Sequence, residues 1–337
     1  MFNFDEARYE GIQAGAVALA EPLHETLGTL LGGGVKNLWF LGSGGAGILM
    51  YPAVTLLQRQ SSLPVYVDYP AEVIHDAPAA LGAGSLVVIP SLSGTTKESI
   101  AALNSVKERG ATVITLTGDA QSPLATAADH TFTNAAADDT SSESFYLQSL
   151  LIALSVLHHV DGYADYDAVV GELRTLPKVL LGLKTQAEEM APEVSSALAA
   201  SDYHIITGPG AVWAEAFYYG MCILEEMQWI RTRPVHSSDF FHGTLELVEK
   251  GVSIVLLKGE DSSRALAERI EAFAPQVTDK LTVLDAAAFE LAGISSRTRE
   301  LISPVVLAAA LERISAHLEV TTRHPLVTRR YYRRLSY

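Results

Sequence analysis

The sequence predicts an α/β protein made of two similar units, each a parallel β-sheet flanked by helices. Short β-rich runs alternate with helical patterns, as in successive β-α-β units. The order of these runs recurs in the second half, where YHIITGPG matches NLWFLGSG, GVSIVLLKG matches GSLVVIPSL, and TVLDA matches TVITL. The offsets are nearly constant, at 166, 167 and 170 residues for the pairs Gly42 and Gly208, Gly84 and Gly251, and Val113 and Val283. A duplication explains this pattern better than two unrelated domains.

The elements can be assigned in chain order from periodicity and punctuation. A helical pattern comes first, and Asn3 or Asp5 could cap it. The β-rich runs LWFLG, VYVDY, SLVVIP, TVITLT and HTFTN follow, and a later helical stretch is broken around Pro177. The predicted divisions are an N-terminal helical segment (1–35), a first domain (36–165), a helical connector (166–199), a second domain (200–322) and an ordered C-terminal tail (323–337).

Composition excludes several classes of protein. The formal net charge is −15, and no run of Lys or Arg is long enough to track a nucleic-acid backbone. The single cysteine, Cys222, rules out an internal disulfide, and its apolar context FYYGMCIL indicates a buried structural thiol. No signal peptide is evident, and no stretch is expected to supply the roughly 18 apolar residues of a membrane span. We therefore expect a cytoplasmic protein that binds neither nucleic acid nor membranes.

The first glycine-rich loop leaves one alternative open. The run LWFLGSGGAG is an apolar strand followed by G-x-G-x-x-G, and the next strand, VYVDY, carries Asp68. That is the outline of a dinucleotide fingerprint, in which the acid would hold a ribose. An oxidoreductase is therefore one possible interpretation.

A second loop favours a single phosphate on a small ligand. The run SLSGTTKE follows the third strand and opens a helix. Thr95 and Glu98 have the spacing of a capping box, which would account for those two residues. Ser91, Ser93 and Thr96 are left unexplained, and hydroxyl groups at a helix N-terminus suit an oxyanion. In a dinucleotide enzyme the phosphate contacts would concentrate on the first glycine loop instead.

The GSGGAG loop, the SLSGTT loop and the repeat together resemble the tandem sugar isomerase (SIS) domains. Such pairs occur in fructosamine-6-phosphate deglycases and in the isomerase half of glucosamine-6-phosphate synthase. The resemblance implies two flavodoxin-like or Rossmann-like domains. It also implies that a sugar phosphate is held by Ser43, Gly44, Ser91, Leu92, Ser93 and Thr96. The stretch TSSESF resembles a further sugar-contacting segment, with Ser141 at the contact position.

The second half contains the residues that the resemblance makes catalytic. A pair of glutamates near a helix end is usually a solvated face, and only one of Glu225 and Glu226 is expected to face a given pocket. Family members carry a helix glutamate and, sixteen residues later, a histidine in an HGPLE-like context. Glu226 and His242 have that spacing, within HGTLE, where Thr244 replaces the usual proline. The implied roles are a proton shuttle for Glu226 and ring opening for His242.

The tail points to one branch of the family. The synthase branch uses a lysine near its C-terminus, whereas HPLVTRRYYRRLSY has none and resembles the tails of the deglycases, as does Glu143, where the synthase branch carries lysine. We expect Arg330 and Tyr331 to dock near the site. In this family the histidine often comes from the neighbouring subunit, which implies a homodimer with a shared site, and dimers that could pair into tetramers.

The implied reaction converts a 6-phosphofructosyl-amine and water into glucose 6-phosphate and an amine or amino acid. No cofactor is expected, and no metal, because the ten histidines show no H-x-x-x-H or similar spacing. An aldose–ketose sugar-phosphate isomerase would use the same pocket. A non-catalytic sugar-phosphate sensor would want a DNA-binding domain, for which the N-terminal segment is too short.

Overall fold

The computed structural model describes residues 1–332 and 334–335. It divides into two compact units, Glu6–Lys178 in one and Met1–Asp5 with Val179–Tyr337 in the other. We call them the first and second unit. Tail positions 333, 336 and 337 lie outside the described residues.

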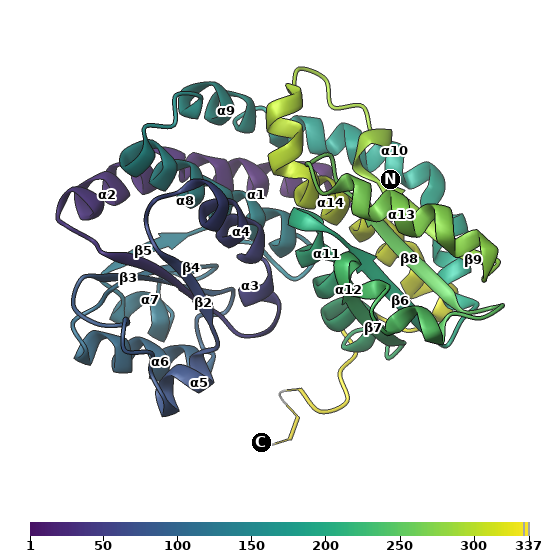
Figure 1. Ribbon diagram of the computed structural model, residues 1–337, viewed down its shortest axis with the longest axis horizontal. Helices are drawn as coiled ribbons and strands as arrows, with labels where there is room; N and C mark the ends of the chain where they lie inside the picture. The colour runs from purple at the N-terminus through teal and green to yellow at the C-terminus, as the bar shows by residue number, and fades with distance from the viewer. Residues whose placement is uncertain (333, 336–337) are drawn as a thin grey trace. The chain divides into compact units, whose positions relative to one another are not determined.

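The first unit contains a five-stranded parallel sheet in the order β2-β1-β3-β4-β5 (Figure 1). The strands are β1 (Asn37–Leu41), β2 (Val65–Asp68), β3 (Ser85–Ser91), β4 (Thr112–Thr117) and β5 (His130–Thr133). All five expected strands are confirmed, and the order is that of a flavodoxin-like fold. Strand β3 is buried along its whole length, as a central parallel strand covered on both faces should be.

Helices cover both faces of this sheet (Figure 1). One face packs against α5 (Pro70–His75), α6 (Lys97–Glu108) and α7 (Pro123–Ala127). The other is covered by α1 (Glu6–Ala18), α2 (Ala20–Gly32), α4 (Tyr51–Gln60) and α8 (Ser141–Asp161). The short α3 (Gly44–Ile48) follows β1, and α9 (Tyr166–Leu173) follows α8.

The N-terminal segment is helical, as expected, and consists of two consecutive helices. The break follows Ala18, and α2 begins at Ala20. Pro22 lies four residues after Ala18; it has no N–H to donate to the Ala18 carbonyl, and its ring would clash with that carbonyl in a continuous helix. Helix propensity alone did not reveal this break.

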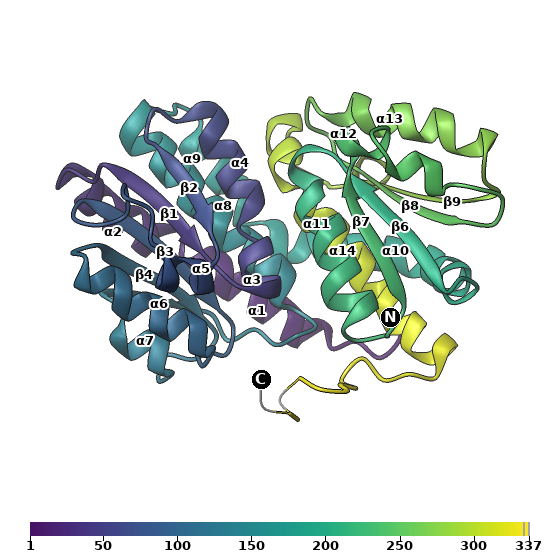
Figure 2. The same cartoon turned by 60° about the horizontal axis from the view of Figure 1, so that its bottom comes forward.

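The second unit repeats the design with one strand fewer. Its parallel sheet has the order β7-β6-β8-β9, which matches the first four strands of the other sheet and confirms the duplicated α/β pattern. The strands are β6 (Tyr203–Gly208), β7 (Arg231–His236), β8 (Ser253–Lys258) and β9 (Lys280–Asp285). Figure 2 shows α12 (Ser237–Phe240) and α13 (Arg264–Phe273) on one face, and α10 (Leu176–Ala199), α11 (Trp213–Tyr218) and α14 (Ser296–Thr322) on the other. Helix α9 ends before Pro177, which lies in the first turn of α10, as expected.

Helix α14 corrects the expectation that no stretch could span a membrane. Among the described residues, this helix is long and apolar enough by length and composition to do so. However, 78% of its apolar window is buried inside the protein. The helix therefore has the character of a core helix.

A buried ionic network joins α10, α14 and the N-terminal residues of the second unit. Lys184 Nζ and Arg313 Nη2 each lie 2.7 Å from a carboxylate oxygen of Glu312. The backbone N–H of Phe2 donates to Glu188 Oε1 at 2.8 Å, and Arg313 Nη1 donates to the Phe2 carbonyl at 2.8 Å. The first residues of the chain are thus attached to α10 and α14.

Candidate active site

The two predicted phosphate-binding loops lie at one edge of the first sheet. Strands β1 and β3 pair in parallel, so the loops that follow them leave from the same edge. A Cβ on Gly42 would overlap Gly47 and come within 3.2 Å of Pro90, so Gly42 serves this close packing. Gly44 is different: it has φ +57°, and a Cβ there would meet nothing within 4 Å. Gly44 and the adjacent Ser43 are therefore open to a ligand.

The loop after β3 presents several hydroxyl groups. Ser91 is buried, and its Oγ accepts a hydrogen bond from the Gly94 N–H at 3.1 Å and lies 3.4 Å from Thr96 Oγ1. The Ser93 Oγ lies 2.9 Å from Thr95 Oγ1, and Ser93 is partly exposed. Gly94 has φ +60°, and a Cβ there would overlap Ser122, so this turn depends on glycine. Leu92, between the serines, is also partly exposed.

The capping box predicted for this loop is wrong. Helix α6 begins at Lys97, so its N-cap is Thr96 and not Thr95, and the Thr96 hydroxyl makes no capping hydrogen bond. Thr95 pairs within the loop instead, with Ser93. The Thr96 hydroxyl therefore accepts no hydrogen bond from the first N–H groups of α6. This arrangement suits the binding of an anion.

Ser141 lies at the beginning of α8, where it is buried and donates to the Asp138 carbonyl at 3.4 Å. Nearby Glu143 is fully buried and accepts hydrogen bonds from the Tyr9 hydroxyl at 3.2 Å and the Ser142 hydroxyl at 3.0 Å. Contact between Ser141 and a sugar stays a prediction.

In the second unit, Glu226 lies where a helix ends in a π-turn. Helix α11 continues as a π-helix over Tyr219–Glu225, and the Glu226 N–H donates to Met221 O, five residues back, at 3.1 Å. π-Turns are rare and frequently mark functional sites. No pattern in the sequence predicts this π-turn, apart from the end of the helical run.

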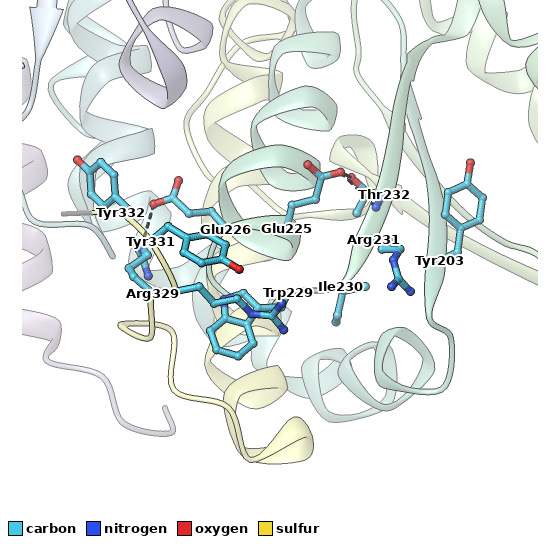
Figure 3. Close-up of a pocket in the computed structure, with 11 residues that line it drawn as sticks. Tyr203, Glu225, Glu226, Trp229, Ile230, Arg231, Thr232, Arg329, Tyr331 and Tyr332 are labelled. Atoms are coloured by element: carbon cyan, nitrogen blue, oxygen red, sulfur yellow. Dashed lines mark hydrogen bonds and ion pairs between the residues drawn. The ribbon is translucent and has the colours of Figure 1, made fainter. Parts of the chain in front are cut away.

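The two glutamates point in different directions (Figure 3). Glu225 Oε1 accepts from the Thr232 hydroxyl at 2.6 Å and from its N–H at 3.2 Å. Glu226 Oε1 accepts from Arg329 Nε at 2.8 Å. Both border one cavity of about 700 Å³. The expectation that only one could face a pocket was wrong, because the cavity extends around the end of the helix.

The C-terminal tail supplies the other wall of this cavity. It is lined by Arg329, Arg330, Tyr331 and Tyr332, of which Figure 3 labels all but Arg330. The Arg330 guanidinium lies 3.9 Å from the centre of the Trp229 ring. Arg330 and Tyr331, expected near the site, thus border the same cavity as Glu226. Arg329, which pairs with Glu226, was missed, and the adjacent arginines of the TRRYY run were the only signal for it.

His242 borders a different hollow. It follows α12, is exposed, and its backbone N–H donates to Asp239 O at 2.9 Å. The hollow has a volume of about 440 Å³ and is lined by Trp213, Arg233, Pro234, Val235, His236, Asp239, His242 and Thr244. Thr244, where the family pattern has proline, is buried and accepts from Arg233 Nε at 3.1 Å. Of these two hollows, the first is lined by Glu226 and the second by His242.

Cys222 is buried, as expected. Burial, with the nearby charge of Glu226, raises the pKa of its thiol to about 12. The thiol is therefore protonated at neutral pH and unsuited to act as a nucleophile.

Known proteins match this chain along most of its length. Residues 35–158 match the SIS domain model. Fructosamine deglycase FrlB of Bacillus subtilis is 30% identical, covering 91% of this chain and 94% of that protein. Fructoselysine 6-phosphate deglycase of Escherichia coli O157:H7 is 28% identical, covering 88% and 86%. A crystal structure from Bacillus subtilis, provisionally assigned as a phosphosugar isomerase, has a TM-score of 0.87 at 28% identity, covering 96% of this chain and 99% of that one.

Proposed function

The chain belongs to the SIS domain family, and from this premise we propose that it is a deglycase acting on 6-phosphofructosyl-amines. It is a phosphosugar-processing SIS protein related to deglycases and isomerases. The proposed products are glucose 6-phosphate and an amine or amino acid. The buried cysteine suits a reducing compartment, so we place the enzyme in the cytoplasm.

One observation carries the choice of reaction within the family. The cavity that holds Glu226 is walled by tail arginines and tyrosines, and no lysine is among the described residues that line it. The synthase branch, by the resemblance described above, uses a lysine from its tail. An arginine-lined cavity without lysine therefore favours the deglycase.

In the proposed mechanism the phosphate group is held by the loops after β1 and β3. Ser91, Ser93 and Thr96 donate from their hydroxyls, and Ser43 and Gly44 flank them. Anion binding at this edge also draws on the first-turn N–H groups of α6. These hydrogen bonds hold the phosphate at the C6 end of the substrate and leave C1 and C2 free to react.

Glu226 is the proposed proton shuttle in the open-chain substrate. Its carboxylate removes a proton from C1 and returns it to C2 through an enaminol, while the amine proton passes to the C2 oxygen. C1 becomes an imine carbon; water adds there, the C1–N bond breaks, and the amine leaves with the remaining proton. Arg329 is a positioning residue, since its Nε–H holds one carboxylate oxygen of Glu226 and leaves the other for the substrate.

His242 is the proposed acid–base group that opens the sugar ring. Because it borders a different hollow from Glu226 in the same unit, we propose that it serves the site of a second subunit in a homodimer. The His242 side chain is exposed, and an imidazole can both accept and donate a proton, which suits that role.

The test is a panel of 6-phosphofructosyl-amino acids with a coupled assay for glucose 6-phosphate. Glu226→Gln should lower kcat by roughly 10²–10⁴-fold, the usual contribution of a positioned proton-transfer group. Glu225→Gln is a matched control because it makes the same change one residue away and can still accept from Thr232. Equal activity of the two variants would overturn the assignment of Glu226.

A further inference from the structure

Three histidines gather at one place in the first unit, outside the phosphate loops. His24 is on α2, and His158 and His159 are in the last turn of α8. One ring nitrogen from each lies within 4.8 Å of the others. No local spacing in the sequence indicates this cluster, because the helices bring together His24 and His158, which are 134 positions apart. Along α8 the cluster is about 25 Å from Ser141, at 1.5 Å per residue.

Hydrogen bonds set the tautomers of two of these rings. His158 Nδ1 lies 3.3 Å from the Tyr163 carbonyl, and His159 Nε2 lies 3.1 Å from the His24 carbonyl. A carbonyl oxygen can only accept, so each of these nitrogens carries the proton of a neutral imidazole. The lone pairs are therefore on His158 Nε2 and His159 Nδ1. Metal-binding histidines are oriented in this way, with the second nitrogen donating to a carbonyl or carboxylate.

The third ring is held in a similar manner. His24 Nδ1 lies 3.0 Å from the Ser155 hydroxyl, and the Tyr166 ring stacks on His24 with centroids 4.2 Å apart. The Ser155 hydroxyl can accept from Nδ1, and in that tautomer the Nε2 lone pair is available to a metal.

Packing between the helices makes room for the third ligand. Gly28 lies one turn after His24 on α2, and a Cβ there would come within 2.7 Å of the His159 ring. Only glycine leaves space for the ring at this position. The cluster therefore draws its ligands from both helices, with His24 partly buried and His159 exposed.

We propose that His24, His158 and His159 bind a divalent transition-metal ion of the class that prefers imidazole, such as Zn²⁺, and that the ion joins α2 to α8. Three neutral imidazoles are a common ligand set for zinc, with the fourth position left to water. Zinc–nitrogen bonds of about 2.0–2.1 Å put adjacent ligand nitrogens about 3.4 Å apart. The candidate nitrogens lie within 4.8 Å of one another, and the His24 and His159 rings stack with centroids 4.2 Å apart, so the side chains must rotate to close the site. This proposal does not depend on the deglycase activity.

The full chain, stripped of metal with a chelator, would be titrated with Co²⁺ followed by absorption spectroscopy, and then with Zn²⁺ in competition. We expect one ion per chain, visible d–d bands, and a thermal midpoint that rises with Zn²⁺ concentration. His159→Ala should weaken Zn²⁺ affinity by at least about tenfold, because even residues that only orient a ligand contribute about 10–100-fold. His75→Ala, an exposed histidine on α5, is the control and should bind as the wild type does.

Gly28→Ala separates ligation from helix stability. Alanine raises helix propensity, so the metal-free variant should be at least as helical as the wild type, yet displacement of the His159 ring should weaken Zn²⁺ binding. Failure of the wild type to bind either ion stoichiometrically would overturn the proposal. Equal Zn²⁺ affinity in wild type and His159→Ala would also overturn it.

Discussion

Lys184→Met should destabilise the second unit by about 3 kcal/mol. The Lys184 side chain is fully buried, and its Nζ lies 2.7 Å from Glu312 Oε2 and 3.3 Å from the Ala309 carbonyl. Removing one partner of a buried ion pair costs about 3–5 kcal/mol, because the other charge stays buried. Arg313 still donates to both Glu312 oxygens, at 2.8 and 2.7 Å, so we expect the lower end of this range. Methionine has a similar volume, which keeps the packing cost below about 1.5 kcal/mol.

Urea denaturation would measure this loss. Trp213 and Trp229 belong to the second unit and Trp39 to the first, so fluorescence of single-tryptophan variants distinguishes the two transitions. Lys178→Met makes the same change at an exposed position of the same helix and should stay within about 0.5 kcal/mol of the wild type. If Lys184→Met costs no more than Lys178→Met, the buried pair contributes nothing and the reasoning fails.

Three further predictions concern the loop, the subunit arrangement and the acid response. Ser93→Ala should weaken glucose 6-phosphate binding by about 1.5–3 kcal/mol in calorimetry, whereas Ser105→Ala on α6 should not; equal affinities would remove the loop from the site. Mixed Glu226→Gln and His242→Asn chains should regain part of the activity through hybrid dimers, and no recovery after confirmed subunit exchange would mean that each chain builds its own site. Burial alone would raise the pKa of Glu312, but its cationic partners Lys184 and Arg313 outweigh burial and lower it. The ion pairs of Glu312 therefore stabilise the folded protein above the unfolded pKa of about 4.3, and this stabilisation is lost as the pH falls through the lower folded pKa. The stability of Glu312→Gln should not show this loss at acid pH. If the stability of the variant fell with pH as the wild type's does, the prediction would be wrong.

Much of the fold could be predicted because local patterns agree with the global one. The β-rich runs alternate with helical patterns in both halves, and each expected strand formed in a parallel sheet. The break at Pro177 followed from proline chemistry.

The rest depended on contacts between residues far apart in sequence. Arg329 reaches Glu226 across 103 positions, and no local pattern distinguishes it from Arg330. The histidine cluster requires the packing of α2 on α8. The N-cap of α6 is Thr96 and not the predicted Thr95, whose hydroxyl pairs with Ser93 instead. A spacing rule cannot anticipate such a contact.

The central claim is tested most directly by counting the amine released for each glucose 6-phosphate formed. A deglycase must release one amine per sugar phosphate, because water breaks the imine at C1. In heavy-oxygen water with an early quench, solvent oxygen must also appear at C1. We expect about one amine per sugar phosphate, as hydrolysis requires. Glu226→Gln should form both products much more slowly. Interconversion of fructose 6-phosphate and glucose 6-phosphate without amine release, across a broad panel of fructosyl-amine phosphates, would contradict the account and make the protein an isomerase.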